Sequence, residues 1–429
     1  ATGSIVNANT AITTVGTANS VTNNGSITGS TGVRFATGSV TLTNNGTGTI
    51  AGGISAVQSD AAVTSTMVSN AGQLLGNANY AIRIQGGSLN LENLTGGNIG
   101  SASGGGINFG GTTASITNRA GATIAGATNF NAIQSTATMA ILNQGTISTV
   151  NPNFTAIFST AKIDLTNASL ITGGYDGVRS SSADSIVTNS GTINGTQFAG
   201  VRMFGGGTVI NSGNITGGQV GIDTQSAAAT IINNGTVSGN VFAIRTVGNF
   251  ADTVTLGAVS TTTGGILLGD GADIFNLTTG AVVSGTVDGG TGFDAFIIDG
   301  TGSSNIAGNV TSFESLTKNG TGTVTLSGNN GAFGTVTINA GNVNASGGNA
   351  IADSDAVVVN AGGDFGLLAN EAIGSLSGAG NVSLNANTLT LGGDNSSTVF
   401  AGIASGTGGL TKIGTGVFTI SGANSYTGI

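Results

Sequence analysis

The chain has 429 residues, of which 78 are Gly and one is Pro, and it contains no His, Cys or Trp. Without His or Cys, Ser-His-Asp and Cys-His catalytic systems and a His-rich zinc site are excluded within this chain. The net charge of −9 argues against a nucleic-acid partner, because phosphate binding needs a dense Lys and Arg surface.

A repeated phrase dominates the first 240 residues. It consists of an apolar pair, an Asn, one or two small residues and then Thr-Ile or Thr-Val, as in residues 186–193. The anchoring residues are Asn23, Asn44, Asn70, Asn93, Asn118, Asn143, Asn167, Asn189, Asn211 and Asn233. Successive anchors lie 21 to 26 residues apart, and a period of about 22 residues indicates a solenoid.

Each repeat is predicted to contain three short strands, for example at 192–194, 200–202 and 208–210, separated by Gly, Asn and Ser. We therefore expect an all-β chain that folds as a right-handed parallel β-helix, with about 22 residues per coil and stacked turn Asn residues. A β-sandwich is the alternative, since Asn-Gly at 24–25, 45–46 and 234–235 favours hairpins. It is disfavoured because Asn-Gly recurs at the repeat period.

Composition and repeat type divide the chain into three segments. Residues 1–249 hold the regular Asn repeats, with seven basic and six acidic groups. Residues 250–312 are rich in Asp and Gly. Residues 313–429 contain a different repeat, and residues 250–429 together carry two basic and twelve acidic groups. We expect coils of one β-helix throughout, with small register changes near 250 and 313.

An Asp cluster lies in the middle segment, at Asp270, Asp273, Asp288 and Asp294. Residues 289–294 read Gly-Gly-Thr-Gly-Phe-Asp, which fits a calcium-binding turn motif. Asp273 and Asp294 are 21 residues apart, or one coil, so they should stack at one corner. Calcium held by these four Asp residues and a solvated Asp-Gly turn both remain open. No other cofactor is expected.

Five of the six arginines occupy one phrase, a small residue and a Val or Ile followed by Arg. They are Arg34, Arg83, Arg179, Arg202 and Arg245. Because the preceding residue should point inward, alternation places the arginines outward in a stripe on one face. The stripe could contact anionic glycans or another copy, or it could only prevent sheet-to-sheet association.

No catalytic residue is predicted, and we expect a protein that is not an enzyme. The exception to weigh is the pair Asp353 and Asp355, which would share a strand face. Glycosidases use two carboxyls roughly 5–9.5 Å apart, so a polysaccharide-active β-helix enzyme is kept as an alternative. A solvated turn explains the same two residues.

The third segment resembles a known family. The sequence Leu316-Thr317-Lys318-Asn319-Gly320 returns as Leu410-Thr411-Lys412-Ile413-Gly414, and the second copy continues to Asn-Ser-Tyr-Thr-Gly at 424–428. This pattern is similar to the passenger-associated repeat of bacterial autotransporters. The resemblance implies a parallel β-helix passenger exported across the outer membrane. Its membrane contact would be made only through a C-terminal barrel, which we do not expect within this chain.

We therefore expect a segment of an extracellular or bacterial cell-surface passenger, acting as an adhesin or stalk through multivalent contacts. The expected partners are host-cell or matrix glycans or proteins, or copies of the chain itself. A self-assembling extracellular filament or surface layer is the main alternative, because uncapped coils expose strand edges.

Overall fold

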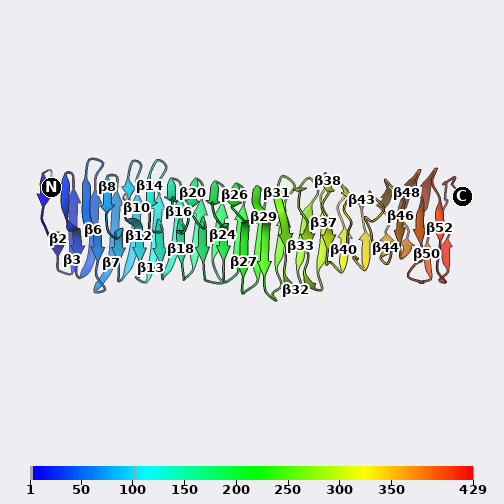
Figure 1. Cartoon of the computed structure of the whole chain (residues 1–429), viewed down its shortest axis with the longest axis horizontal. Coiled ribbons are helices and arrows are strands. Elements are labelled where there is room, and N and C mark those ends of the chain that lie inside the picture. The colour runs from blue at the N-terminus through cyan, green and yellow to red at the C-terminus, as the bar shows by residue number, and fades with distance from the viewer. Residues whose placement is uncertain (1–2, 101–102, 429) are drawn as a thin grey trace. The chain divides into compact units, whose positions relative to one another are not determined.

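The computed structural model describes residues 3–100 and 103–428, and these form strands, turns and bends without any helix. They fall into two compact units, Ala1–Ala227 and Ala228–Ile429. Within each unit, strands pair in parallel with the equivalent strand of the neighbouring coil (Figure 1). Each unit is therefore a parallel β-solenoid, as the sequence period predicts.

One coil of unit 1 shows how the sequence forms this fold. Its strands are β22 (Ile186–Asn189), β23 (Thr192–Gly195) and β24 (Ala199–Met203). The next coil begins with β25 (Gly207–Asn211), which pairs with β22 in register. Gly, Ser and Asn turns end each strand after four or five residues. The three strands predicted for this repeat are confirmed.

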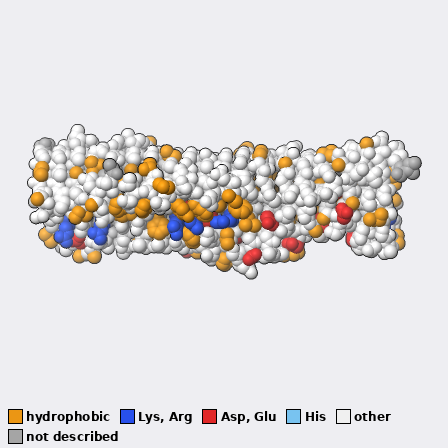
Figure 2. Space-filling view, viewed as in Figure 1, with side chains coloured by type: hydrophobic (Ala, Val, Ile, Leu, Met, Phe, Trp, Pro, Cys, Tyr) orange, Lys and Arg blue, Asp and Glu red, His pale blue; other side chains and the backbone are white. Residues whose placement is uncertain are grey.

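The core consists of inward columns with one residue per coil, because alternate side chains of a strand point to opposite faces. The column along the first strand of each coil contains Leu42, Val68, Leu91, Ile116, Ile141, Leu165, Val187 and Val209. Each of them is at most 2% exposed. On the face that Figure 2 shows, charged side chains are few, and hydrophobic side chains lie among surface that is neither hydrophobic nor charged.

A buried Asn ladder stabilises the turns of unit 1. The strands that end in these Asn residues are β3 (Ala18–Asn23), β5 (Gly38–Asn44), β7 (Val63–Asn70), β10 (Ser88–Asn93), β13 (Thr113–Asn118), β16 (Thr138–Asn143), β19 (Ile163–Asn167), β22 and β25. From Asn23 to Asn211, each side-chain Nδ2 donates to the Oδ1 of the next Asn at 2.7–2.9 Å. The predicted stacking of turn Asn residues is confirmed.

Unit 2 replaces this column by other residues. Leu256, the last residue of β30 (Thr253–Leu256), pairs with Asn233, and the column continues as Leu277, Ile298 and Lys318. The neighbouring core contains a stack of three buried rings, Phe275, Phe296 and Phe313. Consecutive ring centroids lie 5.0 and 5.7 Å apart. The polar turn groups of unit 2 must therefore form their hydrogen bonds with groups outside this column.

Candidate binding surface

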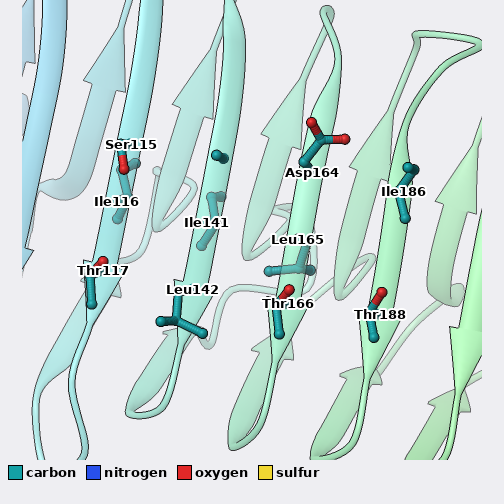
Figure 3. A pocket seen from close by; sticks show the side chains of 11 residues that line it. Ser115, Ile116, Thr117, Ile141, Leu142, Asp164, Leu165, Thr166, Ile186 and Thr188 are labelled. Atoms are coloured by element: carbon teal, nitrogen blue, oxygen red, sulfur yellow. The ribbon is translucent and has the colours of Figure 1, made fainter.

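A shallow groove of about 430 Å³ lies on the outward face of β13, β16, β19 and β22 in unit 1 (Figure 3). Ala140, Leu142 and Ile186 give it an apolar lining, with Thr side chains beside them. Asp164 at its edge forms an ion pair with Lys162 at 3.1 Å. Neither a paired carboxylate nor an aromatic ring lines the groove. Sequence analysis did not predict it.

A second surface of unit 1 carries four of the predicted stripe arginines. The strands involved are β4 (Ser26–Phe35), β6 (Thr49–Ser59), β9 (Tyr80–Ile84), β12 (Gly105–Phe109), β15 (Ile133–Ser135), β18 (Ile157–Ser159), β21 (Val178–Ser180), β24 and β27 (Val220–Gln225). Their paired residues form what we call the planar row: Arg34, Gln58, Arg83, Asn108, Gln134, Phe158, Arg179, Arg202 and Asp223. Every member ends in a planar guanidinium, amide, carboxylate or aromatic group.

The fifth predicted arginine, Arg245, lies in unit 2 on β29 (Thr236–Val247). It pairs with Leu267, and Leu267 pairs with Asp288. The row of planar side chains is therefore described for unit 1, and Arg245 is considered separately.

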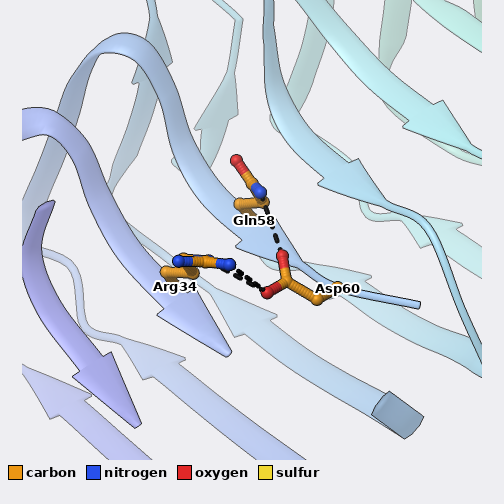
Figure 4. Close-up of polar contacts among 3 residues, drawn as sticks. All are labelled: Arg34, Gln58 and Asp60. Atoms are coloured by element: carbon orange, nitrogen blue, oxygen red, sulfur yellow. Dashed lines mark hydrogen bonds and ion pairs between the residues drawn. The ribbon is translucent and has the colours of Figure 1, made fainter. Parts of the chain in front are cut away.

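At the start of the planar row, Arg34 is held by Asp60 (Figure 4). Its Nε and Nη2 donate to the same Asp60 oxygen at 2.9 and 2.6 Å, and Gln58 donates to the other oxygen at 3.0 Å. Burial alone would raise the pKa of Asp60, but these hydrogen bonds outweigh it and lower the pKa below its ordinary value. Arg34 is 45% exposed, so water screens this pair.

Further along the row, two arginines stack against phenylalanine rings. The Arg179 guanidinium carbon lies 5.3 Å from the Phe158 ring centroid and 4.7 Å from that of Phe204. Arg202 lies 4.4 Å from both Phe198 and Phe204. These distances are within the range of cation–π attraction. The rings cover the flat faces of both guanidinium groups, which leaves their edges for hydrogen bonding.

Two buried carboxyls lie near these arginines. Asp223 forms an ion pair with Arg202 Nε at 3.2 Å and accepts a hydrogen bond from Gln225 at 2.9 Å. Asp176 Oδ1 accepts the backbone N–H of Ala199 at 3.1 Å. Burial raises the pKa of Asp176 to about 6, although Arg202 and Arg179 oppose the shift. Asp176 is therefore mostly ionised at pH 7 and mostly neutral at pH 5.

An aromatic column that sequence analysis missed runs beside the row. It consists of Phe130, Phe154, Tyr175 and Phe198, in consecutive coils. The N–H of Tyr175 donates to the carbonyl of Phe154 at 2.8 Å, and that of Phe198 to Tyr175 at 3.1 Å. The Tyr175 and Phe198 rings stack at 5.8 Å. The signal was present, because each member stands four residues before a member of the planar row.

Gln134 is oriented by its neighbours. Its Oε1 accepts the Tyr80 hydroxyl at 2.6 Å and the Asn131 amide at 3.1 Å. Burial raises the pKa of Tyr80 to about 12, so its hydroxyl remains a donor at neutral pH. With its oxygen engaged twice, Gln134 presents its NH₂ group as the donor available to a ligand.

The predicted calcium ligands of unit 2 separate into two groups. Asp270 is exposed and accepts the Thr291 hydroxyl at 2.5 Å, and Asp288 is half-buried and accepts the Gly290 N–H at 3.2 Å. Asp273 and Asp294 are buried at 1% and 0% exposure. The latter two stack one coil apart as expected, but the expectation of a solvated corner is wrong for them.

A carboxyl ladder in unit 2 consists of the buried Asp252, Asp273 and Asp294 and the half-buried Glu314. The N–H groups of the first three members donate at 2.7 Å to the side chain of the next member. Burial raises the pKa of Asp273 to about 7 against the lowering effect of its hydrogen bond with the Asp252 N–H, and the neighbouring carboxylates add to the rise. The second oxygens of Asp273 and Asp294 have no hydrogen-bond partner.

In residues 3–100 and 103–428 there is no group of three or more acidic side chains placed to hold a metal ion. The ladder carboxyls bind backbone N–H groups instead, with one oxygen each. Calcium at Asp270, Asp273, Asp288 and Asp294 stays a prediction.

Asp353 and Asp355 do not share a face. Asp355 is buried, and its two oxygens accept the N–H groups of Phe333 and Gly334 at 2.9 and 3.0 Å. Asp353 is exposed in the preceding turn. The shared strand face predicted for them is wrong, because Asp355 enters the core to bind the coil before it.

The lysine of the repeated Leu-Thr-Lys motif has a structural role in its first copy. Lys318 is fully buried, and its ammonium donates to the carbonyl oxygen of Gly320 and, at 3.3 Å, to that of Ala340 one coil later. Burial lowers its pKa. Lys412, in the second copy, is exposed and donates to Ile413 and Gly414. The motif thus ties its turn carbonyls to an ammonium group.

Comparison with known families gives one match. Residues 316–345 and 410–429 match the family described as the passenger-associated-transport-repeat. No curated protein and no solved structure matches the chain. No helix in the described part of the chain has the length and apolarity that crossing a membrane requires. Two copies of the repeat on a parallel β-solenoid confirm the resemblance found in the sequence, and they support an autotransporter passenger domain with passenger-associated transport repeats.

Proposed function

We propose that this passenger segment acts as an adhesin or structural stalk at the bacterial cell surface. The passenger repeats imply a secreted or cell-surface protein. The observation that carries the adhesive role is the planar row, which presents one planar side chain per coil, at about 4.8 Å intervals, along unit 1. Weak contacts at fixed spacing add through effective concentration. Host-cell or matrix glycans or proteins are the partners we expect.

The test is adhesion of beads that carry the full chain at graded densities to surfaces coated with matrix glycans or matrix proteins. Multivalent binding predicts a steep rise of adhesion with chain density and weak competition by free chain. The double variant Arg83→Gln/Arg179→Gln removes two row cations without ion-pair partners and should reduce adhesion. Its control is Arg119→Gln/Lys162→Gln, which removes an exposed and a half-buried cation outside the row, each ion-paired with a carboxylate.

Two results would count against the proposal. Beads that fail to adhere at every density on every surface would remove the adhesive role. Particle growth of the free chain with concentration, measured by light scattering, would instead favour the self-assembling filament or surface layer.

A further inference from the structure

Arg179, like Arg83, differs from Arg34 and Arg202 of the planar row because it forms no ion pair in the described part of the chain. Arg34 is paired with Asp60, and Arg202 with Asp223. Among the residues that the structure describes, no ion pair includes Arg179. Asp176 is the nearby carboxyl whose pKa the charge of Arg179 lowers. It is buried and accepts a hydrogen bond from the Ala199 N–H. The row therefore holds a half-buried cation that no bound carboxylate neutralises.

The geometry at Arg179 limits which ligand atoms can reach it. Phe158 and Phe204 cover the guanidinium faces, and Nε is buried without a hydrogen-bond partner. The edge of the guanidinium is the part that remains for a ligand to contact. A guanidinium edge matches the two oxygens of a carboxylate or sulfate group in a bidentate contact. An uncharged hydroxyl would use only part of this donor set.

The adjoining members of the row suit sugar hydroxyls. Gln134 and Asn108 lie two and three coils from Arg179, on the same outward line. The NH₂ group of Gln134 is left to donate, and the half-buried amide of Asn108 can both donate and accept. Phe158 between Gln134 and Arg179 offers an apolar ring edge. A ligand chain that carries hydroxyls, ring C–H groups and an acid group would complement these side chains.

An acidic peptide fits this surface less well. Peptides that bind sheets add a strand at an open edge, where backbone groups are unpaired. The strands beneath the row pair with both neighbouring coils, as β18 does with β15 and β21. Their backbone groups are thus engaged, and only side chains are offered to a partner.

We infer that the planar row from Asn108 to Arg179 binds the chain of an acidic polysaccharide, whose carboxylate or sulfate group is held by Arg179. This inference rests on the adhesive function proposed above and names its ligand class. The chain lies along the coils, with its hydroxyls on Gln134 and Asn108 and its acid group on the Arg179 edge.

The experiment measures binding of the full chain to four polymers by isothermal titration calorimetry at low salt and pH 5.5. At this pH Asp176 is largely protonated, while sugar carboxylates stay ionised. The polymers are heparin for sulfate, hyaluronate for carboxylate, dextran as the uncharged glycan and polyglutamate as the acidic peptide. We expect heparin or hyaluronate to bind more tightly than dextran and polyglutamate. Equal binding of polyglutamate, or no binding of either acidic glycan, would overturn the inference.

Three variants locate the site. Arg179→Gln keeps a planar side chain without the charge and should weaken binding about tenfold. Arg179→Lys keeps the charge but lacks the planar pair of donors, and it should weaken binding by a smaller factor. Arg119→Gln removes an exposed arginine outside the row and should leave binding unchanged. Equal losses for Arg119→Gln and Arg179→Gln, or wild-type affinity for both Arg179 variants, would overturn the assignment.

Folding is controlled by the thermal midpoint of each variant, which should stay close to that of wild type because Arg179 forms no ion pair and loses only its two ring contacts. The bead assay separates this inference from the proposed function. Adhesion that persists without acidic-glycan binding refutes the ligand class and leaves the adhesin, whereas glycan binding without adhesion refutes the adhesin and leaves the site.

Discussion

The two units satisfy their buried turns with different chemistry. Unit 1 uses the Asn ladder at the ends of strands such as β10 and β13, where amides bond to one another. Unit 2 places aliphatic residues in that column and puts the carboxyl ladder just before the equivalent strands, at Asp252 before β30 and Asp273 before β33 (Ile274–Thr278). The same parallel stacking thus supports a neutral ladder in one unit and an ionisable ladder in the other.

The difference follows from the hydrogen-bonding capacity of the two groups. An amide has a donor and an acceptor, so identical rungs complete one another. An ionised carboxyl only accepts, so each rung can bind a backbone N–H but not the next carboxyl. One oxygen of Asp273 and one of Asp294 consequently lack a partner. The carboxyl ladder should therefore depend on pH, and the Asn ladder should not.

The largest expected effect is a loss of unit 2 stability as pH rises. Burial raises the folded-state pKa values of two carboxyls to about 7, well above the unfolded values. They are Asp273 of the carboxyl ladder and Glu371, a separate buried carboxyl that accepts the Ala350 N–H at 3.2 Å. A raised acid pKa gives stability that is full below about pH 4 and disappears as pH approaches 7. We expect roughly 4 kcal/mol between pH 4 and pH 8, after discounting the two shifts by half. Urea unfolding at both pH values measures it.

Unit 1 provides the internal control for that titration, because its ladder is neutral. Asp176 is its one described carboxyl with a raised pKa, at about 6, so its stability should fall by less over the same range. Equal losses in the two units would show that the carboxyl ladder is not the cause.

The second prediction breaks the Asn ladder with a carboxylate. In Asn93→Asp, the new side chain loses the donor that reaches Asn118 Oδ1 at 2.9 Å and the Thr123 carbonyl at 3.0 Å. A buried charge that keeps only the Asn70 amide as a donor and faces two acceptor oxygens should cost about 3 kcal/mol in the free energy of unfolding at pH 7. Asn90→Asp on the exposed face of the same strand is the control and should change little. Equal costs would contradict the ladder account.

The third prediction converts one rung of unit 2 into the chemistry of unit 1. Asp273→Asn keeps the oxygen that accepts the Asp252 N–H and removes the ionisable group. It should stabilise the chain at pH 8 by roughly 1–3 kcal/mol and have little effect at pH 4, since each pKa unit corresponds to about 1.4 kcal/mol. Asp270→Asn, at an exposed position of the same turn, should be neutral at both pH values. Destabilisation of Asp273→Asn at pH 8 would refute the explanation.

The smallest effect is expected at the surface of unit 1. Arg34→Gln removes the ion pair with Asp60 and should lower the urea midpoint by a small fraction of either ladder effect, because exposed ion pairs contribute little. The pKa of Asp60 is lowered in the folded state, so its contribution is present above about pH 4 and lost on acidification. In 0.5 M salt the difference should vanish. A difference that persists in salt would require a packing role for Arg34.

The sequence predicted the features that recur at the coil period. The Asn anchors, the stacking of Asp273 on Asp294 and the alignment of Arg179 with Arg202 all follow from spacing alone, because equal spacing in a solenoid becomes vertical alignment. The aromatic column was equally periodic, but Phe and Tyr are also ordinary core residues, so its position on the surface was not recognised.

Burial at the turns could not be predicted in this way. Asp-Gly sequences usually form solvated turns, which is why Asp273 and Asp294 suggested calcium or solvent. The outcome depended on whether the carboxyl turned into the core and accepted an N–H group of the preceding coil. Asp355 shows the same behaviour, while Asp353 two residues earlier remains exposed. Periodicity fixes the column, and the local turn geometry decides between core and surface.

Hydrogen exchange of the full chain at pH 5.5 and pH 8, corrected for intrinsic rates and resolved by peptide, tests the central difference most directly. The account predicts that the opening free energy of residues 250–300 falls at pH 8, while that of residues 110–170 stays constant. Constant protection in both regions, or an equal loss in both, would contradict the assignment of a neutral ladder to unit 1 and an ionisable one to unit 2.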